Sequence, residues 1–467
     1  MSVLVMKFGG TSVGSPEALN QCAEIIRNTH KEHPQLVVVI SALSGVTDIL
    51  LRCARQAADG DEGGLKRSLA ELRARHLDML HATCTAEKHC KQAEKDITQL
   101  LDQASSLCSA IQILGEASPR ALDAIASLGE RMSILILAEI LRQKNVAAEP
   151  IAATQLIRTD ATHQSANPDY ATTGTLCREM LLPLLEKGTV PVITGFIGAT
   201  EKGVVTTLGR GGSDYSAAIL GTALKAEAVW IWTDVDGVMT ADPRVVPEAH
   251  TIQTLSFREI SELAYYGAKV LHPKTIRPVI EAGIDLRVLN TFDPGNPGTQ
   301  IVLDQFALAE NTIKAVTIIK GLRLITLEGR GMLGVPGVAA RTFRSIASTQ
   351  TSVPLISQAS SEQSICFAVP SESTIQVMEA IQTEFEREIT HRDIDSVWAT
   401  DEVVIISVVG AGMRNIPGVA GKVFSTLGEE KVNVIAIAQG SSEVSISFIV
   451  SAQDGTKAVR ALHRLIH

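Results

Sequence analysis

The sequence predicts a three-layer α/β/α domain with a mainly parallel sheet, followed by two small ferredoxin-like units. Three observations support this fold class. Near-continuously apolar runs alternate with amphipathic segments over residues 1–292, a Pro/Gly-rich break follows at residues 293–299, and the rest of the chain contains an internal repeat. The alternation is typical of βαβ units, and a gap-free repeat indicates a duplicated module.

The strands of the first domain are predicted from short apolar runs, which are VLVMK, LVVVIS, VPVITGF, AVWIWT and LRVLN. Strands that are covered by helices on both faces have this near-continuous apolar character. Between about residues 65 and 115 the pattern changes to helical periodicity, as in LKRSLAELRARHLDML. We therefore expect a helical insertion within the first domain.

The domain boundary is predicted at DPGNPGT, residues 293–299, which has two prolines and two glycines. Beyond it, residues 321–369 align without a gap on residues 402–450. The matched pairs include Gly329/Gly410, Gly331/Gly412, Met332/Met413, Pro336/Pro417, Gly337/Gly418, Phe343/Phe424, Gln358/Gln439 and Phe367/Phe448. The predicted parts are a first domain over 1–292, a linker with a first strand over 293–320, and repeat units over 321–398 and 399–467.

Each repeat unit reads as a strand, a glycine loop, a helix that begins at Pro-Gly, and two further strands, which is a ferredoxin-like pattern. Neither copy contains reactive residues of its own. A duplicated module of this kind predicts the sensing of a small ligand. A purely structural oligomerisation module is the alternative.

Composition and charge exclude several classes of function. The formal net charge is −9, so the chain lacks the basic excess that binding to nucleic acid requires. No apolar run approaches the roughly 20 residues that span a bilayer. We expect a cytoplasmic protein with no membrane partner.

The seven cysteines are irregularly spaced and form no C-x-x-C pair, which favours reduced thiols over a disulfide framework. The one suggestive cluster consists of His81, Cys84, His89 and Cys90. Imidazole and thiolate are zinc ligands, but the cluster lacks the spacing of a zinc finger. We therefore expect surface and half-buried helix there.

Three glycine-rich segments follow predicted strands, where open α/β sheets form their ligand crevice. They are KFGGTS at Lys7–Ser12, TLGRGGSD at Thr207–Asp214 and TDVDGV at Thr233–Val238. Glycines let backbone N–H groups approach an anion, and the second segment leads into a helix N-terminus. Together they predict a phosphate-binding site.

Two common nucleotide motifs do not account for this site. No G-x-x-x-x-G-K-[ST] occurs in the chain. A G-x-G-x-x-G does occur at Gly329, Gly331 and Gly334, but no acidic residue follows about twenty positions later, and the other repeat has Asn415 in place of the third glycine. We reject nicotinamide binding on these grounds.

The ordered motifs KFGGTS, SALSGVTD, SLGERMS, TLGRGGSDYSAA, WTDVDGV with ADPR, and YYGAKVLHP resemble the aspartokinase branch of the amino acid kinase family. The repeat resembles the paired ACT domains that follow that catalytic domain. The two Gln-Ser-Ser-Glu-type strands are similar to those in the aspartokinase half of bifunctional aspartokinase–homoserine dehydrogenases. Because the sequence stops at His467, we expect a monofunctional relative or a truncated piece of such a fusion.

The resemblance implies an ATP-dependent aspartate kinase, which transfers the γ-phosphoryl group to the side-chain carboxylate of L-aspartate. The product would be 4-phospho-L-aspartate, in the first step of threonine, lysine and methionine biosynthesis. Mg²⁺ would arrive with ATP and have no direct protein ligand. Feedback by an amino acid is implied, threonine first and lysine as the alternative, in a homodimer or homotetramer.

The resemblance and the chemistry together assign the catalytic and substrate residues. An ionised carboxylate needs no general base, so the site must neutralise phosphate charge. Lys7 is the expected charge clamp, and Asp214 would orient Lys7 or the Mg²⁺ shell, with a helix N-cap as its alternative role. The substrate residues are Glu130 for the α-ammonium, Arg210 for a carboxylate, and Ser41 and Thr47 for hydroxyl contacts. Glu130 could instead be a surface helix residue, and Ser41 could be purely structural.

The ATP contacts are expected from Lys7, Gly9, Gly10, Thr11, Thr233, Asp234, Met239, Arg244 and Lys269. Met239 stands where many relatives have an aromatic residue, and Lys269 could instead be an exposed residue at a helix end. The effector contacts are expected from Gln358, Asn433 and Gln439, because a buried amide can satisfy the polar groups of an amino acid. Cross-strand hydrogen bonding is the alternative role for the two glutamines.

Other functions remain open at this stage. A kinase for glutamate, N-acetylglutamate or carbamate is the enzymatic alternative, and Glu130 discriminates, since an N-acylated substrate has no ammonium. A non-catalytic amino acid sensor with a kinase fold is the alternative from another class. Intact Lys7, Arg210 and Asp214 favour an active enzyme.

Overall fold

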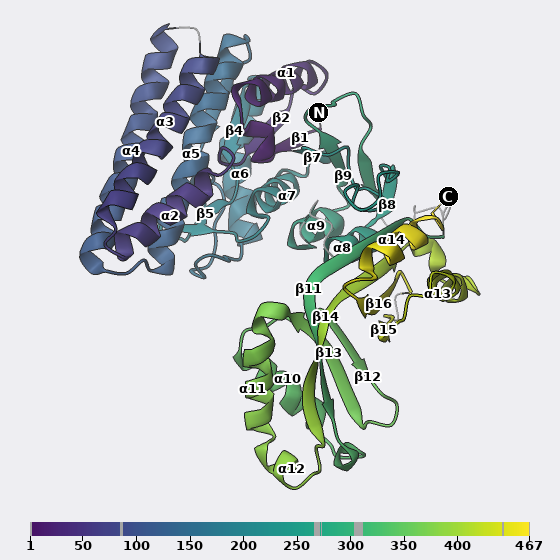
Figure 1. The fold of residues 1–467 in the computed structure, drawn as a ribbon. Helices are drawn as coiled ribbons and strands as arrows, with labels where there is room; N and C mark the ends of the chain where they lie inside the picture. The colour runs from purple at the N-terminus through teal and green to yellow at the C-terminus, as the bar shows by residue number, and fades with distance from the viewer. Residues whose placement is uncertain are drawn as a thin grey trace. The chain divides into compact units, whose positions relative to one another are not determined.

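The computed structural model describes residues 2–84, 87–265, 271, 273–302, 312–440 and 443–466. The described residues form two compact units (Figure 1). The first contains residues 2–238, 251–257 and 271–302, and the second contains residues 239–250, 258–265 and 312–466. Each unit has its own sheet.

The sheet of the first unit has the strand order β3-β4-β2-β1-β7-β9-β10-β8, and all neighbours are parallel except β9 and β10. Every residue of β1, β2 and β4 is buried. The predicted mainly parallel sheet is therefore confirmed. The strands are β1 Leu4–Phe8, β2 Leu36–Ile40, β3 Ala148–Ile151, β4 Val190–Thr194, β7 Ala228–Thr233, β8 Thr254–Ser256, β9 Asp285–Asn290 and β10 Thr299–Val302, with a separate hairpin of β5 Ile197–Ala199 and β6 Val205–Thr207.

Four helices of the first unit lie side by side as a bundle (Figure 1): α2 Val46–Ala58, α3 Glu62–Thr83, α4 Glu87–Leu114 and α5 Pro119–Gln143. The segment that the sequence marked as helical is the hairpin of α3 and α4. The bundle and the sheet share one apolar core. The remaining helices are α1 Pro16–Glu32, α6 Tyr170–Glu186, α7 Gly212–Leu224 and α9 Pro273–Glu281.

A disulfide joins Cys84 to Cys90, with Cα atoms 5.8 Å apart. The expectation of reduced thiols is wrong for this pair, because the α3–α4 hairpin brings the end of one helix to the start of the next. The pair also removes two of the four suggested zinc ligands. Within the described residues, no group of three or more His, Cys, Asp and Glu side chains could hold a metal ion.

The Pro/Gly-rich segment at residues 293–299 forms the turn between β9 and β10. Gly298 has φ +66°, and a Cβ there would lie 2.0 Å from the Val288 carbonyl oxygen, so only glycine fits. Since β10 pairs with both β9 and β8, the sheet of the first unit continues to Val302. The boundary predicted at residue 292 therefore lies inside this sheet.

The second unit is built on an antiparallel sheet with the order β12-β13-β11-β14-β16-β15. Its strands are β11 Ala315–Glu328, β12 Leu355–Gln358, β13 Ser364–Pro370, β14 Ser396–Val409, β15 Ala436–Ala438 and β16 Ser445–Ser451. Its helices are α10 Val338–Ser348, α11 Thr374–Glu384, α12 Glu386–Thr390, α13 Val419–Glu429 and α14 Gly455–His463. The long central strands β11 and β14 each serve both repeats (Figure 1).

The repeat seen in the sequence is reproduced in the packing of this unit. The rings of Phe343 and Phe367 meet edge to face at 5.9 Å, and their counterparts Phe424 and Phe448 do so at 5.8 Å. Gly334 and its counterpart Asn415 both have left-handed backbones, with φ +69° and +59°. The third glycine of the G-x-G-x-x-G therefore serves a turn that asparagine also tolerates.

Two segments that precede residue 292 belong to the second unit. Residues 239–250 contribute Ala241, Val245 and Val246 to its apolar core. All but the first residue of α8 Phe257–Tyr265 belong to it as well, and Glu259 of that helix is fully buried and accepts a hydrogen bond of 2.7 Å from the Ala411 N–H. The second unit thus holds parts of the chain that the sequence assigned to the first domain.

Among the helices that the structure describes, none combines the length and the apolar character needed to cross a membrane.

Candidate active site

Two of the three glycine-rich segments that the sequence singled out follow the neighbouring parallel strands β1 and β7, whereas the third, Thr207–Asp214, follows β6 of the separate antiparallel hairpin. The strand order β2-β1-β7 brings the residues after β1, the loop that starts at Ser41 and the Thr233–Asp234 segment to one edge of the sheet. This edge is at the carboxyl ends of parallel strands, where open α/β sheets bind their ligands. The Ser41 N–H donates to the Phe8 carbonyl at 3.2 Å and ties two of the loops together.

Lys7 and Asp214 form an ion pair. Lys7 belongs to β1 and is only 8% exposed, and Asp214 lies in the first turn of α7. The N-cap of α7 is Gly211, with φ +70°, and no side chain caps this helix. The alternative role of Asp214 as an N-cap is therefore wrong, and its carboxylate is directed to the lysine.

The glycines of the first loop keep space open around Lys7. A Cβ on Gly9 would lie 3.4 Å from the Lys7 Nζ atom, and the Gly9 N–H donates to the Trp232 carbonyl at 3.2 Å. Ser12 at the end of the loop is fully buried, and its Oγ lies 2.7 Å from the Thr291 Oγ1. Thr291 was missed in the sequence because nothing in its local pattern marks it. It anchors the glycine loop to the end of β9.

Glu130 has the chemistry of a site for a cation. It lies on α5, is 3% exposed, and accepts a hydrogen bond from the Ala42 N–H. Its Oε2 is buried and has no hydrogen-bond partner among the described residues. Burial raises the pKa of Glu130 to about 8, against the smaller opposing effect of backbone N–H donors. The alternative of a surface helix residue is wrong.

Gly129 explains how the Glu130 carboxylate reaches Ala42 in the loop after β2. A Cβ on Gly129 would lie 2.9 Å from the Ala42 Cβ and 3.0 Å from the Val46 Cγ1, so glycine permits α5 to pack tightly on this loop and on α2. Thr47 lies in the first turn of α2, after Gly45 with φ +74°. Ser41, Thr47 and Glu130 are thereby brought into one neighbourhood.

Arg210 lies between Gly209 and Gly211, both of which have positive φ, and its side chain is exposed. Within the described residues its guanidinium makes no hydrogen bond or ion pair with another group of the protein. Gly195 leaves room for the adjacent Ser213, because a Cβ at Gly195 would lie 2.6 Å from the Ser213 Oγ. A free planar cation therefore stands next to the helix N-terminus that carries Asp214.

The nucleotide residues are divided between the units. Gly10 is half-buried, Thr11 is exposed, and the Thr233 Oγ1 donates to the exposed Asp234 at 3.1 Å in the first unit. Met239 and Arg244 belong to the second unit, where Arg244 pairs with Asp242 at 2.7 Å. Lys269 lies outside the described residues. Its role and those of Met239 and Arg244 stay predictions.

The effector residues are more exposed than the sequence indicated. Gln358 is exposed and lines a cavity of about 390 Å³ with the segment from Gly334 to Ala339. Gln439 and Asn433 are exposed in the second repeat. The expectation of a buried amide is wrong for Gln358 and Gln439. The Gln358 side chain makes no cross-strand hydrogen bond within the described residues.

Sequence reasoning also missed Asp123, which lies on α5 seven positions before Glu130 and is 1% exposed. Seven residues are close to two helical turns, so both carboxylates share one face of the helix. That spacing was the available signal, since two acidic residues on one face of an otherwise apolar helix are unusual.

The comparison with known proteins shows the family of the chain. The model of the amino acid kinase family matches residues 2–290, and the ACT domain model matches residues 325–385 and 406–465. The chain is 36% identical to the chloroplastic bifunctional aspartokinase/homoserine dehydrogenase 2 of Arabidopsis thaliana, over 98% of this chain and 50% of that protein. It is 33% identical to the lysine-sensitive aspartokinase 3 of Escherichia coli, over 99% and 98%. The chain thus spans about half the length of its bifunctional plant relatives.

Solved structures show the same fold along the whole chain. Escherichia coli aspartokinase III in complex with aspartate and ADP, in the R-state, has a TM-score of 0.81 at 31% identity and covers 99% of both chains. The same enzyme with lysine and aspartate, in the T-state, has a TM-score of 0.80 at 32% identity. The chain therefore belongs to the amino acid kinase family, in its aspartokinase branch with tandem ACT domains.

Proposed function

We propose that this chain transfers the γ-phosphoryl group of ATP to the side-chain carboxylate of L-aspartate, giving 4-phospho-L-aspartate and ADP. The observation that carries the proposal is the buried Glu130 oxygen without a partner, since an uncompensated carboxylate at this depth calls for a cationic group. The α-ammonium of an amino acid is such a group. The reaction would be the first step toward threonine, lysine and methionine.

The remaining charges fit the rest of the substrate. Arg210 can hold a carboxylate through two parallel N–H donors, and Ser41 and Thr47 adjoin Ala42 and Val46, which pack against Gly129 beside Glu130 and would add hydroxyl contacts. A substrate with an acylated nitrogen would leave Glu130 without a counter-charge. The site therefore favours a free amino acid over N-acetylglutamate or carbamate.

The chemistry requires positioning and charge neutralisation. An oxygen of the aspartate carboxylate attacks the γ-phosphorus, and the bond from phosphorus to the ADP oxygen breaks. Because the carboxylate is already ionised, no general base is needed. Lys7 neutralises charge on the transferred group, the N–H group of Gly10 supplies a further donor, and Asp214 keeps the Lys7 ammonium in place.

The carboxylates proposed for this site fit Mg²⁺ only if the phosphates of the nucleotide supply most of its ligands. Mg²⁺ commonly binds through one or two carboxylates and the substrate phosphates, and Asp214 is the carboxylate next to the Lys7 ammonium. When bound, the ion would neutralise charge on the phosphate oxygens. Thr233 and Asp234 at the end of β7 would contact the nucleotide.

The test is direct. The purified chain, Mg-ATP and L-aspartate are incubated with hydroxylamine, which traps an acyl phosphate as a hydroxamate, while ADP release is followed. N-acetyl-L-aspartate, which lacks the ammonium, and L-asparagine, which lacks the side-chain carboxylate, are the matched controls. We expect both signals with aspartate alone. Absence of both with aspartate would contradict the proposal.

We also propose feedback inhibition by an amino acid bound at the ACT repeats. The cavity beside Gln358 is of suitable size for such a ligand, and its glycine-rich rim contributes backbone polar groups. Threonine is the proposed effector because the Gln-Ser-Ser-Glu-type strands are similar to those of the bifunctional relatives. Titration of threonine and lysine into the same assay decides between them, and inhibition by lysine alone would contradict the choice of threonine.

A further inference from the structure

Asp123 is a buried carboxylate that the proposed chemistry does not use. Its two oxygens accept hydrogen bonds from three groups: the His163 Nδ1 at 2.6 Å, the Thr207 Oγ1 at 2.7 Å and the Gln164 N–H at 3.2 Å. Since a carboxylate only accepts, the imidazole Nδ1 and the threonine hydroxyl are the donors. Charge-assisted hydrogen bonds in a buried setting are among the stronger ones. Asp123 therefore joins α5, the loop after β3 and the end of β6.

Thr207 connects the Asp123 carboxylate to the loop that carries Arg210. Thr207 is the last residue of β6, and Arg210 follows three positions later. The Thr207 side chain is held by Asp123, and its carbonyl accepts the Ala166 N–H at 2.9 Å. The start of the Arg210 loop is thus fixed through both its side chain and its backbone.

The loop that supplies His163 also touches the Arg210 loop. A Cβ on Gly209 would lie 3.0 Å from the Gln164 carbonyl oxygen, so the two backbones are in close contact. Gln164 has φ +68°, a left-handed conformation that is unfavourable for a residue with a side chain. Its N–H bond to Asp123 holds it there. Contacts with the surrounding structure thus keep Gln164 in an unfavourable backbone conformation, and strained residues of this kind are common beside functional sites.

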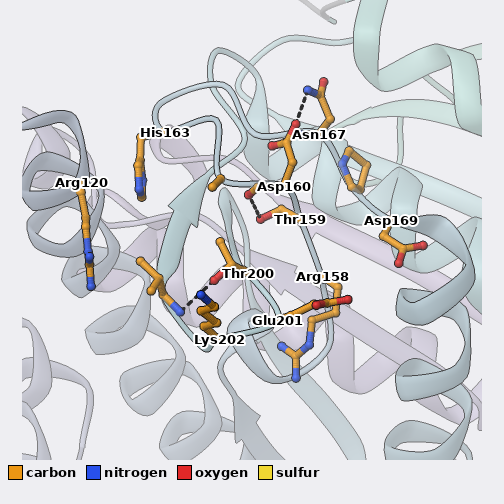
Figure 2. A pocket seen from close by; sticks show the side chains of 13 residues that line it. Arg120, Arg158, Thr159, Asp160, His163, Asn167, Asp169, Thr200, Glu201 and Lys202 are labelled. Carbon is orange, nitrogen blue, oxygen red and sulfur yellow. Dashed lines mark hydrogen bonds between the residues drawn. The ribbon is translucent and has the colours of Figure 1, made fainter.

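His163 stands at the border between this network and solvent. It is one of the residues that line a cavity of about 720 Å³, and Figure 2 shows it with Arg120 among the lining side chains. Asp160 on the same loop uses its carboxylate locally, accepting from Thr162 and Asn167, and does not reach Asp123. The cavity offers nothing that indicates a ligand of its own. The contact that matters here is the hydrogen bond that the His163 Nδ1 donates to the buried Asp123 carboxylate.

We propose that Asp123 and His163 are positioning residues that set the spacing between Arg210 and Glu130, and so the fit of the amino acid substrate. Asp123 and Glu130 lie on one face of α5, about 10 Å apart along the helix axis. Asp123 fixes the loop that carries Arg210 through Thr207, and Glu130 binds the α-ammonium of the substrate. This inference rests on the proposed aspartate kinase activity.

The network acts on the substrate side of the site and not on the nucleotide side. None of its described contacts involves the loops after β1 and β7. Loss of the network should therefore raise the KM for aspartate and leave the KM for ATP nearly unchanged. A general loss of stability would change both.

The variants come in matched pairs. Thr207→Val keeps the shape of the side chain and removes the hydroxyl, whereas Thr207→Ser keeps the hydroxyl. His163→Phe keeps a ring and removes the donor, whereas His163→Asn places an amide N–H near the position of Nδ1. Glu201→Gln removes an exposed charge that lines the same cavity and is the control. These mild changes avoid dependence on Asp123→Asn, which alters three hydrogen bonds at once.

We expect Thr207→Val and His163→Phe to raise the KM for aspartate by about tenfold or more, the usual effect of losing a hydrogen bond to a buried charge. The KM for ATP should change less than about twofold, and Thr207→Ser, His163→Asn and Glu201→Gln should resemble the wild type. An unchanged KM for aspartate in both donor-free variants overturns the inference, as does an equal rise in the two KM values.

The proposed activity and the positioning role fail in different ways. A wild-type chain that makes no acyl phosphate contradicts the activity. Calorimetric titration of L-aspartate into the same proteins then tests the positioning role by binding alone. Weaker binding to Thr207→Val with normal binding to Thr207→Ser supports it, and equal binding to all variants overturns it.

Discussion

The Lys7 ammonium and the Asp214 carboxylate form an ion pair between the central strand β1 and the first turn of α7. Both side chains are largely buried, with 10% and 14% of their surfaces exposed. A pair held away from water stays fixed in geometry. The expected charge clamp is therefore in place before any substrate arrives.

We predict that Lys7→Met lowers kcat by about 10³-fold, the scale found when one stabilising donor is removed from a transition state. The KM for aspartate should change much less, because Glu130 and Arg210 remain. Steady-state kinetics with the hydroxamate assay measure both quantities. A KM effect without a kcat effect would assign Lys7 to binding.

The double variant Lys7→Met/Asp214→Asn separates catalysis from stability. Each single change leaves a buried charge without its partner, which is costly, whereas the double change removes both charges. We expect a higher Tm for the double variant than for Lys7→Met, with kcat still low. A Tm loss equal to the sum of the single losses would show that the pair is not energetically coupled.

Glu130 predicts a pH dependence of aspartate binding. Its pKa of about 8 means that the empty site is mostly protonated at pH 7, while the substrate ammonium requires the ionised form. The KM for aspartate should fall as the pH rises toward 8, by up to about tenfold per pH unit, and level off above it. Glu130→Gln should give a high KM with no such slope.

Glu130 also predicts how stability depends on pH: aspartate binding should improve as the pH rises, whereas the stability of the fold should decrease. The folded-state pKa is raised above that of the unfolded chain, so the unfolded chain ionises first, and stability is lost as the pH rises from about 4.3 to about 8. The Gln variant lacks this loss. Its Tm relative to the wild type should increase between pH 5 and pH 8.5 in the absence of ligand. A difference that is constant with pH would contradict the raised pKa.

Arg210 should act mainly on the KM for aspartate. Arg210→Ala is expected to raise it by about 10- to 100-fold, the range for hydrogen bonds to a charged group, and Arg210→Lys should restore only part of the loss because lysine lacks the two-point fork. Lys202→Ala removes an exposed charge from the nearby β5–β6 hairpin and is the control. Equal KM values for all three proteins would remove Arg210 from the substrate site.

Gln358→Ala should weaken threonine inhibition by about tenfold without changing uninhibited kcat, because it removes polar groups from the cavity wall in the first repeat. Gln439→Ala tests the equivalent position of the second repeat. Gln382→Ala, an exposed residue on α11, is the matched control. Inhibition curves for threonine and lysine measure the effect. Curves that coincide for Gln358→Ala and Gln382→Ala would exclude this cavity as the effector site.

Local sequence patterns predicted much of the fold and the site. Apolar runs such as LVVVI form buried strands because burial on both faces requires near-continuous hydrophobicity. The Gly-Glu pair at Gly129 and Glu130 predicted a special helix position, and in the structure the glycine allows close packing and the carboxylate is buried. Residue types at such positions are determined by local geometry and burial, so they can be recognised from the sequence.

Long-range contacts could not be predicted in this way. The sequence alone predicted a mainly parallel α/β domain of the amino acid kinase family, a duplicated ACT module and the charged residues proposed for the site. Only the tertiary structure decided that residues 239–250 pack with the regulatory repeats, that Cys84 bonds to Cys90, and that His163, Thr207 and Asp123 meet. The physical reason is that such contacts depend on how packed elements close in space, and no local period or motif records which distant residues become neighbours.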